Sequence, residues 1–337
     1  MSTVKVISNY LLLAALETNG YGNGATVSPT VNTVLCAGGD APDATIAYSY
    51  DGDRKGMALS GGNQRRTTPS GKSITTKIDM DLKGNGIGYN TSVSGSPPVH
   101  NFLLASGFSG SLSAGAWTYT YTPITTAPNS LALQLYSRIA GGSGAEVYPI
   151  SGSYGKMSFK ADTNGGPLVM SFALSGIPGT PTDAVAVPTN ITWNASSVIP
   201  PKGEKLSFTA GSFVANLRDV SYDDGLDIGP RVNLSATGSF SGYYIGRRSP
   251  KLTVTIEDDA FSSYSPLADW DSAVQRSVSF TVGSGLTANS CTMTFPSASI
   301  GSVKPDKSGD IATWVIEYYP TPSSPSANDD VILTFNA

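Results

Sequence analysis

One pattern occurs twice in this chain and constrains its fold more than any other feature. Residues 65–81 read RRTTPSGKSITTKIDMD, and residues 247–259 read RRSPKLTVTIEDD. Both run from an Arg pair through Pro and Lys into alternating residues that end in acid. A period of two is typical of a strand with one buried face. The buried faces are predicted to be Ile74, Thr76 and Ile78 in the earlier copy and Leu252, Val254 and Ile256 in the later one.

Further cues accompany both copies in the same order. A Ser-Tyr-Asp strand end and an Asp/Gly turn precede each copy, and a Pro that starts a short predicted helix follows it. The paired segments are 48–53 and 220–227, helices 98–107 and 266–274, strands 117–121 and 277–282, and strands 155–160 and 290–295. Four cues in one order indicate a duplicated domain.

The duplication divides the chain into four parts. Residues 1–30 form an N-terminal arm with a strand-like apolar run, and residues 31–175 form the first domain. The Pro-rich segment 176–204 is the predicted linker. Residues 205–337 form the second domain, whose last strand, 331–335, follows a Pro/Ser stretch at 320–326. That strand is predicted to leave its own domain and pair with a neighbour.

Composition indicates the fold class. The chain has 337 residues, which fits two domains, and its 37 Gly and 22 Pro favour short strands and tight turns. We therefore expect a mostly β protein of two tandem antiparallel β-sandwich or barrel domains, each with one short helix. The net charge is −4, and no basic run is present, so tight binding of nucleic acid through phosphate contacts is excluded.

The residues give little support for catalysis or zinc binding. The single His, His100, falls inside the first predicted helix, where a hydrogen-bonded surface or core residue is the expected role. One His and two distant cysteines, Cys36 and Cys291, do not make a zinc site, and we expect both thiols to be free. Glu257, Asp258 and the acid after them fit a solvated strand end better than a glycosidase pair.

Calcium binding at the two Asp-rich turns is the remaining ligand hypothesis. Asp51 and Asp53 cluster in one turn, and Asp223 and Asp227 in the other, but neither turn has the spacing of a helix-flanked calcium loop. Turn formation is the preferred interpretation. We therefore predict no catalytic, cofactor-binding or metal-binding residues and no cofactor.

The order of several motifs resembles a known family. Residues 11–22 carry LLLAALET followed by Tyr-Gly, and Ala105-Ser-Gly-Phe108 ends the first helix. A strand ending in Tyr-Thr-Pro123 follows, then Ser130-Leu-Ala-Leu-Gln-Leu-Tyr136 and a Gly-Ser-Tyr-Gly-Lys strand at 152–156. This order resembles the tail tube proteins of long-tailed bacteriophages, in the larger form with two tube domains per chain. The similarity covers nearly the whole chain.

The resemblance implies a structural virion protein and no enzyme. Such proteins assemble into stacked rings that form the tail tube through which DNA passes during genome ejection. Rings of the family usually present six tube domains, so three chains with approximate sixfold symmetry are expected. The implied partners are other copies of the chain, the tape-measure protein, and tail terminator or baseplate proteins, with DNA as cargo and no membrane. The implied location is the virion tail, assembled in the bacterial cytoplasm.

The resemblance also implies contacts between rings. The arm at 1–30, the loop at 54–70 and the tail from Pro320 are the candidates. The alternative function is a secreted or cell-surface β-sandwich adhesin or carbohydrate-binding protein, for which Trp117, Tyr119 and Tyr121 would form an aromatic platform. A glycosidase using two carboxylates is the third hypothesis.

Overall fold

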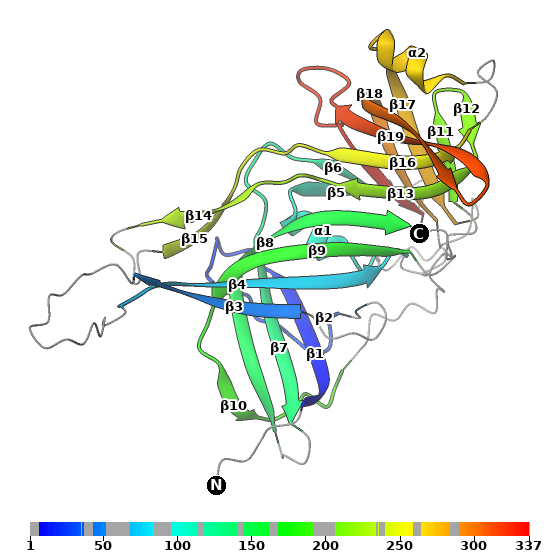
Figure 1. Cartoon of the computed structure of the whole chain (residues 1–337). Coiled ribbons are helices and arrows are strands. Elements are labelled where there is room, and N and C mark those ends of the chain that lie inside the picture. Colours follow the sequence, from blue (N-terminus) through cyan, green and yellow to red (C-terminus); the bar gives the residue numbers. More distant parts are fainter. Residues whose placement is uncertain are drawn as a thin grey trace, which may run out of the picture.

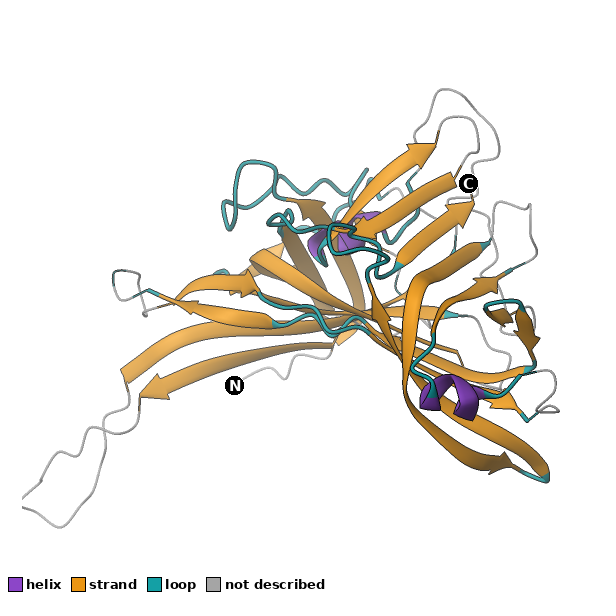
Figure 2. Cartoon of the chain, turned by 90° about the horizontal axis from the view of Figure 1, so that it is seen from above, coloured by secondary structure: helices purple, strands orange, loops and turns teal. Residues whose placement is uncertain are grey.

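The structure is a computed structural model of the chain. It describes residues 7–34, 36, 43–51, 68–83, 96–113, 118–139, 144–161, 168–191, 206–233, 235, 240–258, 264–283 and 290–336. For residues 7–9, 43–51, 68–72, 138–139, 240 and 336 it describes the backbone alone. The described chain is mostly β, as predicted, with large antiparallel sheets and two short helices (Figure 2).

One antiparallel sheet runs through both halves of the chain (Figure 1). Eight of its strands lie side by side, each paired with its neighbour in the order given below, and we call them the long sheet. The order is β3 (Asp43–Asp51), β4 (Thr68–Asp81), β9 (Val169–Pro178), β8 (Ala145–Ala161), β13 (Leu217–Asp223), β16 (Lys251–Glu257), β19 (Ile311–Thr321) and β18 (Cys291–Ser308).

The order of strand pairing in the first half recurs in the second. β1 (Ile7–Leu16) pairs with β2 (Thr33–Val34) and β7 (Leu131–Ile139), and β7 pairs with β8. β11 (Leu206–Ala210) likewise pairs with β12 (Phe213–Ala215) and β17 (Gln275–Val282), and β17 pairs with β18. The path β1–β7–β8–β9–β4–β3 therefore has the same connections as β11–β17–β18–β19–β16–β13. Because β17 takes the place of β7, the predicted match of strand 117–121 with strand 277–282 is wrong.

The helices occupy matching places after β4 and β16. α1 (His100–Ala105) is followed by Gly107, whose φ of +81° ends the helix in a conformation that favours glycine. α2 (Pro266–Asp271) starts with Pro at its first turn, and the Ser265 hydroxyl accepts a hydrogen bond from the Ala268 N–H at 3.3 Å. Both helices predicted from the sequence are therefore confirmed, each shorter than its predicted span.

Other strands connect the halves or extend from them. The hairpin β5 (Phe108–Ser113) and β6 (Thr118–Pro123) follows α1. The C-terminal β20 (Ile332–Asn336) lies between β18 and β6 and so joins the second half to the first. β10 (Thr182–Val185) pairs with β8. The hairpin β14 (Ile228–Val232) and β15 (Phe240–Ile245) forms a separate two-stranded sheet.

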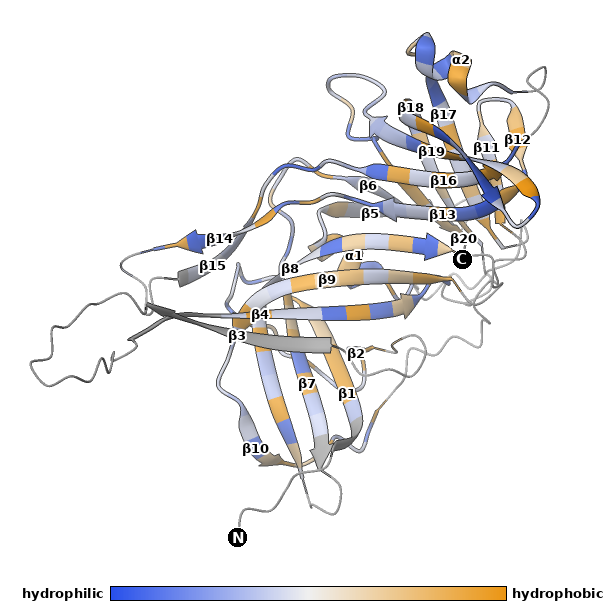
Figure 3. Ribbon diagram, viewed as in Figure 1, coloured by the Kyte–Doolittle hydropathy of each residue, from blue (hydrophilic) through white to orange (hydrophobic). Residues whose placement is uncertain are grey.

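Alternation along the strands determines which face is buried. Ile74, Thr76 and Ile78 of β4 are buried, as are Leu252, Val254 and Ile256 of β16. Figure 3 shows the alternation of hydrophobic and hydrophilic residues along β16. Both predictions of the buried faces are confirmed.

The hydrophobic core is shared between the halves. One cluster of buried residues includes side chains from both, and Phe159 of β8 stacks on Phe280 of β17 with ring centroids 5.2 Å apart. Phe280 also packs against Phe295 of β18, 6.3 Å away. The halves are therefore joined by apolar packing as well as by backbone hydrogen bonds.

The strand-like run predicted in the arm at 1–30 forms β1, which pairs with β7 and β2 and buries Leu11, Leu12 and Leu13. Two other details of the predicted organisation need correction. The predicted linker at 176–204 includes the end of β9 and all of β10. Pro320 and Thr321, assigned to a loop, belong to β19.

The shared core makes a specific prediction about stability. Phe280→Ala removes a ring that is 2% exposed and packs against aromatic rings of both halves. We expect a loss of about 3–5 kcal/mol in the free energy of unfolding, as for other buried Phe to Ala changes. Chemical denaturation measures the loss. Val214→Ala is the control, since Val214 is 67% exposed, and its change should stay within about 0.5 kcal/mol. Equal effects of the two changes would contradict the prediction.

Candidate functional site

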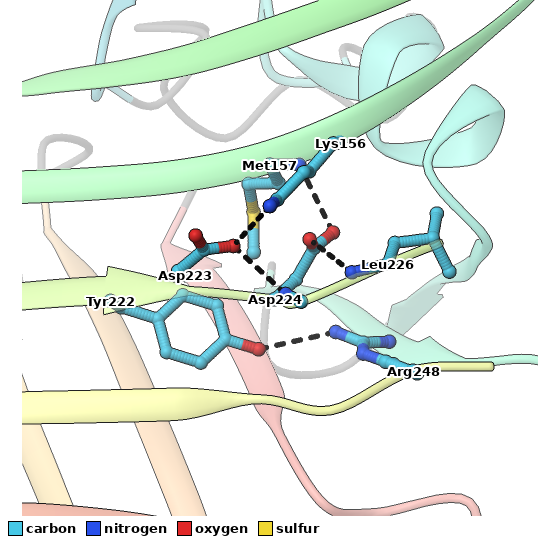
Figure 4. Close-up of polar contacts among 8 residues, drawn as sticks. Lys156, Met157, Tyr222, Asp223, Asp224, Leu226 and Arg248 are labelled. Carbon is cyan, nitrogen blue, oxygen red and sulfur yellow. Dashed lines mark hydrogen bonds and ion pairs between the residues drawn. The ribbon is translucent and has the colours of Figure 1, made fainter. Parts of the chain in front are cut away.

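The joint between the halves is made by β8 and β13. Residues 158–161 of β8 pair with residues 223–220 of β13. Asp224 extends this pairing (Figure 4): its N–H donates to the Met157 carbonyl at 3.1 Å, and its Oδ2 accepts from the Met157 N–H at 3.0 Å. Its Oδ1 accepts from the Leu226 N–H at 3.1 Å. The buried carboxylate therefore satisfies backbone donors from both halves.

Arg248 lies at the same joint and contacts several elements. It donates to the Tyr222 hydroxyl at 3.2 Å, and its Nε is 3.6 Å from Oδ2 of Asp330, next to β20. Its guanidinium lies 4.4 Å from the centroid of the Phe108 ring in β5. Burial raises the pKa of Asp224 to about 6, although the positive charge of Arg248 lowers it. Arg248 thus connects β13, β5 and the start of β20.

Tyr21 forms a second connection between the halves. Its ring stacks on Tyr154 of β8 at 5.2 Å, and its hydroxyl accepts from the Tyr243 N–H of β15 at 2.7 Å. A Cβ on Gly152 or on Gly242 would lie 2.8 or 2.3 Å from Tyr21 atoms, so both positions need glycine. The buried Glu17 carboxylate fixes this loop by accepting hydrogen bonds from backbone N–H groups at 22, 24 and 152.

The outer face of the long sheet is polar and continuous across the joint. Paired residues of antiparallel strands point to the same side. One row of paired residues crosses seven strands: Asp81, Val169, Lys160, Ser221, Thr253, Glu317 and Ser302. We call this outer surface the polar face.

Several lysines of the polar face lie beside carboxylates. Lys156 lies 3.3 Å from Asp223 across the joint, and Lys251 lies 2.8 Å from Glu317. The hydrogen bond from Lys251 lowers the pKa of Glu317, and the same bond raises the pKa of Lys251. A hollow of about 560 Å³ lies over the joint, and Asp79, Ser158, Lys160, Ser221, Asp223, Lys251 and Thr253 are among the residues that line it. The face therefore presents hydroxyls and paired charges.

The candidate catalytic residues have structural partners. His100 Nδ1 lies 2.8 Å from the Tyr121 hydroxyl, and burial lowers the pKa of this His. Glu257 pairs with Arg218 and accepts from Asn216 at 3.1 Å, and Asp258 accepts from the Trp314 indole N–H at 2.7 Å. The acid at 259 lies outside the described residues. The geometry does not bring these residues together as a catalytic set.

The second Asp-rich turn has the hydrogen bonds of a turn. Asp223 Oδ1 accepts from the Gly225 N–H at 2.9 Å, and the N–H of Asp227 donates to the Arg247 carbonyl at 2.9 Å. The side chain of Asp51 and all of Asp53 lie outside the described residues. No group of acids, His and Cys suited to a metal ion occurs in the described part of the chain.

Three other sequence predictions have different outcomes. Cys36 and Cys291 are free thiols, as expected, and burial raises the pKa of Cys36 to about 11. The aromatic platform proposed for an adhesin is wrong in one member, because Tyr121 is fully buried. Residue 117 lies outside the described residues, as do positions 54–67 of the proposed ring-contact loop.

Sequence reasoning missed Asp224, Arg248 and Tyr21 as joint residues. Their roles depend on contacts between distant segments. The only sequence signals were the Asp-rich turn around Asp224 and the Arg pair that contains Arg248.

Comparison with known proteins gives no further identification. The chain matches no family model and no curated protein. Among the described residues, no helix has the length and apolar character needed to span a bilayer.

The buried Asp224 makes stability depend on pH. Its folded pKa of about 6 lies above the unfolded value near 3.9, so the folded state binds the proton more tightly. Protonated Asp224 contributes about 3 kcal/mol to the free energy of unfolding. This contribution is fully present below about pH 4 and is lost as the pH rises through about 6. Asp224→Asn should make the decline in the free energy of unfolding between pH 4 and 7 smaller by this amount, while Asp330, whose pKa burial also raises, keeps its own contribution. Asp227→Asn, at an exposed position, should leave the decline unchanged, and equal declines in the two variants would contradict the assignment.

Proposed function

We propose that this chain is a structural subunit of a bacteriophage tail tube. Its halves act as two tandem tube domains, and three chains complete a ring of approximate sixfold symmetry. Rings stack into the tube through which DNA passes. The observation that carries the proposal is the long sheet, which continues through both halves and presents a polar face with compensated charge.

The ends of the long sheet support assembly. Among the described strands, β3 pairs with β4 alone, and residues 300–308 of β18 pair with β19 alone. Unpaired strand edges are templates for pairing with another chain. A closed barrel removes such edges and encloses an aqueous lumen when many strands take part. Copies arranged in a ring would satisfy both edges in this way.

The polar face is suited to line a channel for DNA. Tight binding to DNA requires cations that neutralise phosphates. Lys77, Lys156 and Lys251 instead lie near carboxylates of this chain, at 3.3, 3.3 and 2.8 Å. A lining of hydroxyls and paired charges stays wetted and holds phosphates weakly, so DNA can pass without being retained.

Microscopy of the purified protein tests the proposal. At high concentration we expect annular particles or tubes with a central hole in negative stain, and ring averages should show approximate sixfold symmetry from three chains. Light scattering at the same concentrations should give masses well above 34.9 kDa. A monodisperse monomer at every concentration would contradict the proposal and favour a binding module.

The role of the polar face can be tested by charge reversal. Asp79→Lys with Asp81→Lys changes the charge of this face by about +4 and should increase retention of double-stranded DNA at low salt by at least about tenfold, because unpaired lysines neutralise phosphates. Asp271→Lys with Asp227→Lys gives the same charge change at exposed positions on α2 and the turn after β13. DNA co-sedimentation with assembled protein measures retention. Equal retention by both variants would reject the polar face as the DNA-facing surface.

A further inference from the structure

We propose that the free edge of β18 in one copy pairs with β3 of the next copy, as β8 pairs with β13 within the chain. This inference rests on the proposed assembly and identifies the strands and register of its lateral contact. The partner is a second copy of this chain, because the chain already contains both sides of the contact in its own internal joint.

The equivalence of β18 and β8 follows from their pairing partners. Met157 of β8 pairs with Phe172, which pairs with Ile78 of β4. Pro305 of β18 pairs with Trp314, which pairs with Ile256 of β16. Ile78 and Ile256 are matching positions of the duplicated pattern, so Pro305 corresponds to Met157. Residues 306–309 therefore correspond to residues 158–161, the segment that receives β13. The predicted match of strand 155–160 with strand 290–295 is therefore wrong.

β3 corresponds to β13 in the same way. Ser221 of β13 pairs with Thr253 of β16, and Thr45 of β3 pairs with Thr75 of β4. Thr253 follows Leu252 as Thr75 follows Ile74, so Thr45 corresponds to Ser221. The Ser-Tyr-Asp cues at 49–51 and 221–223 therefore do not occupy equivalent positions, because Ser49 pairs with Gly71, four residues from Thr75. β3 and β13 are each the first strand of the long sheet in their half.

Among the described strands, only β19 pairs with β18 beyond Ser299. β17 pairs with β18 only as far as Ser299, and β20 only with residues 291–294. Residues 304–310, which include the end of β18, are exposed. β3 and β18 lie at opposite ends of the long sheet (Figure 1). Contacts between opposite ends are head-to-tail, and they close into a ring when the rotation per copy permits.

The internal joint sets the register. Ser221 lies opposite Lys160, and Asp223 lies opposite Ser158. The corresponding pairs between copies are Thr45 with Ser308 and Ala47 with Asp306. Directly opposed residues in antiparallel strands have Cα atoms about 4.5–5.5 Å apart, which is within reach of a disulfide.

Cysteine pairs test this register in the full-length chain with Cys36→Ser. Thr45→Cys with Ser308→Cys should form disulfide-linked dimers and trimers on oxidation at assembling concentrations. Ala47→Cys with Asp306→Cys should do the same in the next row. Ser221→Cys with Lys160→Cys is the positive control, and it should form an intrachain disulfide that leaves the protein monomeric on a denaturing gel.

Thr75→Cys with Ser308→Cys is the matched negative control. Thr75 pairs with Thr45 and so lies one strand farther from Ser308, about 10 Å away, beyond the reach of a disulfide. We expect at least tenfold less cross-linked product from this pair. Circular dichroism verifies folding of each variant, and mixing the two single Cys variants should give dimers that stop at two chains.

The outcomes separate this inference from the function on which it rests. Cross-linking in both predicted rows and not in the negative control supports the register. Rings in the microscope with no cross-link in either row would overturn the inference and leave the tube function standing. Absence of both rings and cross-links would overturn the two together. Equal cross-linking by the Thr75 pair would overturn the register.

Discussion

The structure depends on backbone hydrogen bonds that pass from β8 to β13 without a break in the sheet. These strands come from different halves of the chain, yet residues 158–161 and 220–223 pair as neighbours in one ladder. Unpaired edge groups that are buried cost free energy, so the joint satisfies an edge on each half. Asp224 adds a buried carboxylate that accepts hydrogen bonds from the N–H groups of Met157 and Leu226.

Apolar and aromatic contacts make the joint a rigid part of the fold. Phe159 reaches the second half to stack on Phe280, and Tyr21 reaches it to contact Tyr243. Arg248 reaches the first half through Phe108. These contacts join the halves beside the ladder, and the row of paired residues on the polar face continues across both halves. The long sheet therefore ends at β3 on one side and at β18 on the other.

The sequence predicted what depends on local pattern. The alternation in 74–78 and 252–256 specified buried faces, and Pro266 and Gly107 indicated where short helices begin and end. It did not predict what depends on distant pairing. The apolar run Leu11-Leu-Leu was predicted to be strand-like within an arm, but its pairing partners β7 and β2 could not be predicted from the run itself. The burial of Asp224, in a predicted turn, and of Arg248, in the Arg pair, was not predicted, because it arises only where the halves meet.

The internal joint and the proposed joint between copies differ at one position. In β8 the Met157 N–H donates to Asp224, which ties the internal joint to a buried side chain. In β18 the corresponding residue is Pro305, which has no N–H and therefore cannot make that bond. Prolines in sheets occur mainly at edges, where they discourage unwanted pairing. The internal joint therefore has a side-chain hydrogen bond that the proposed joint between copies would lack.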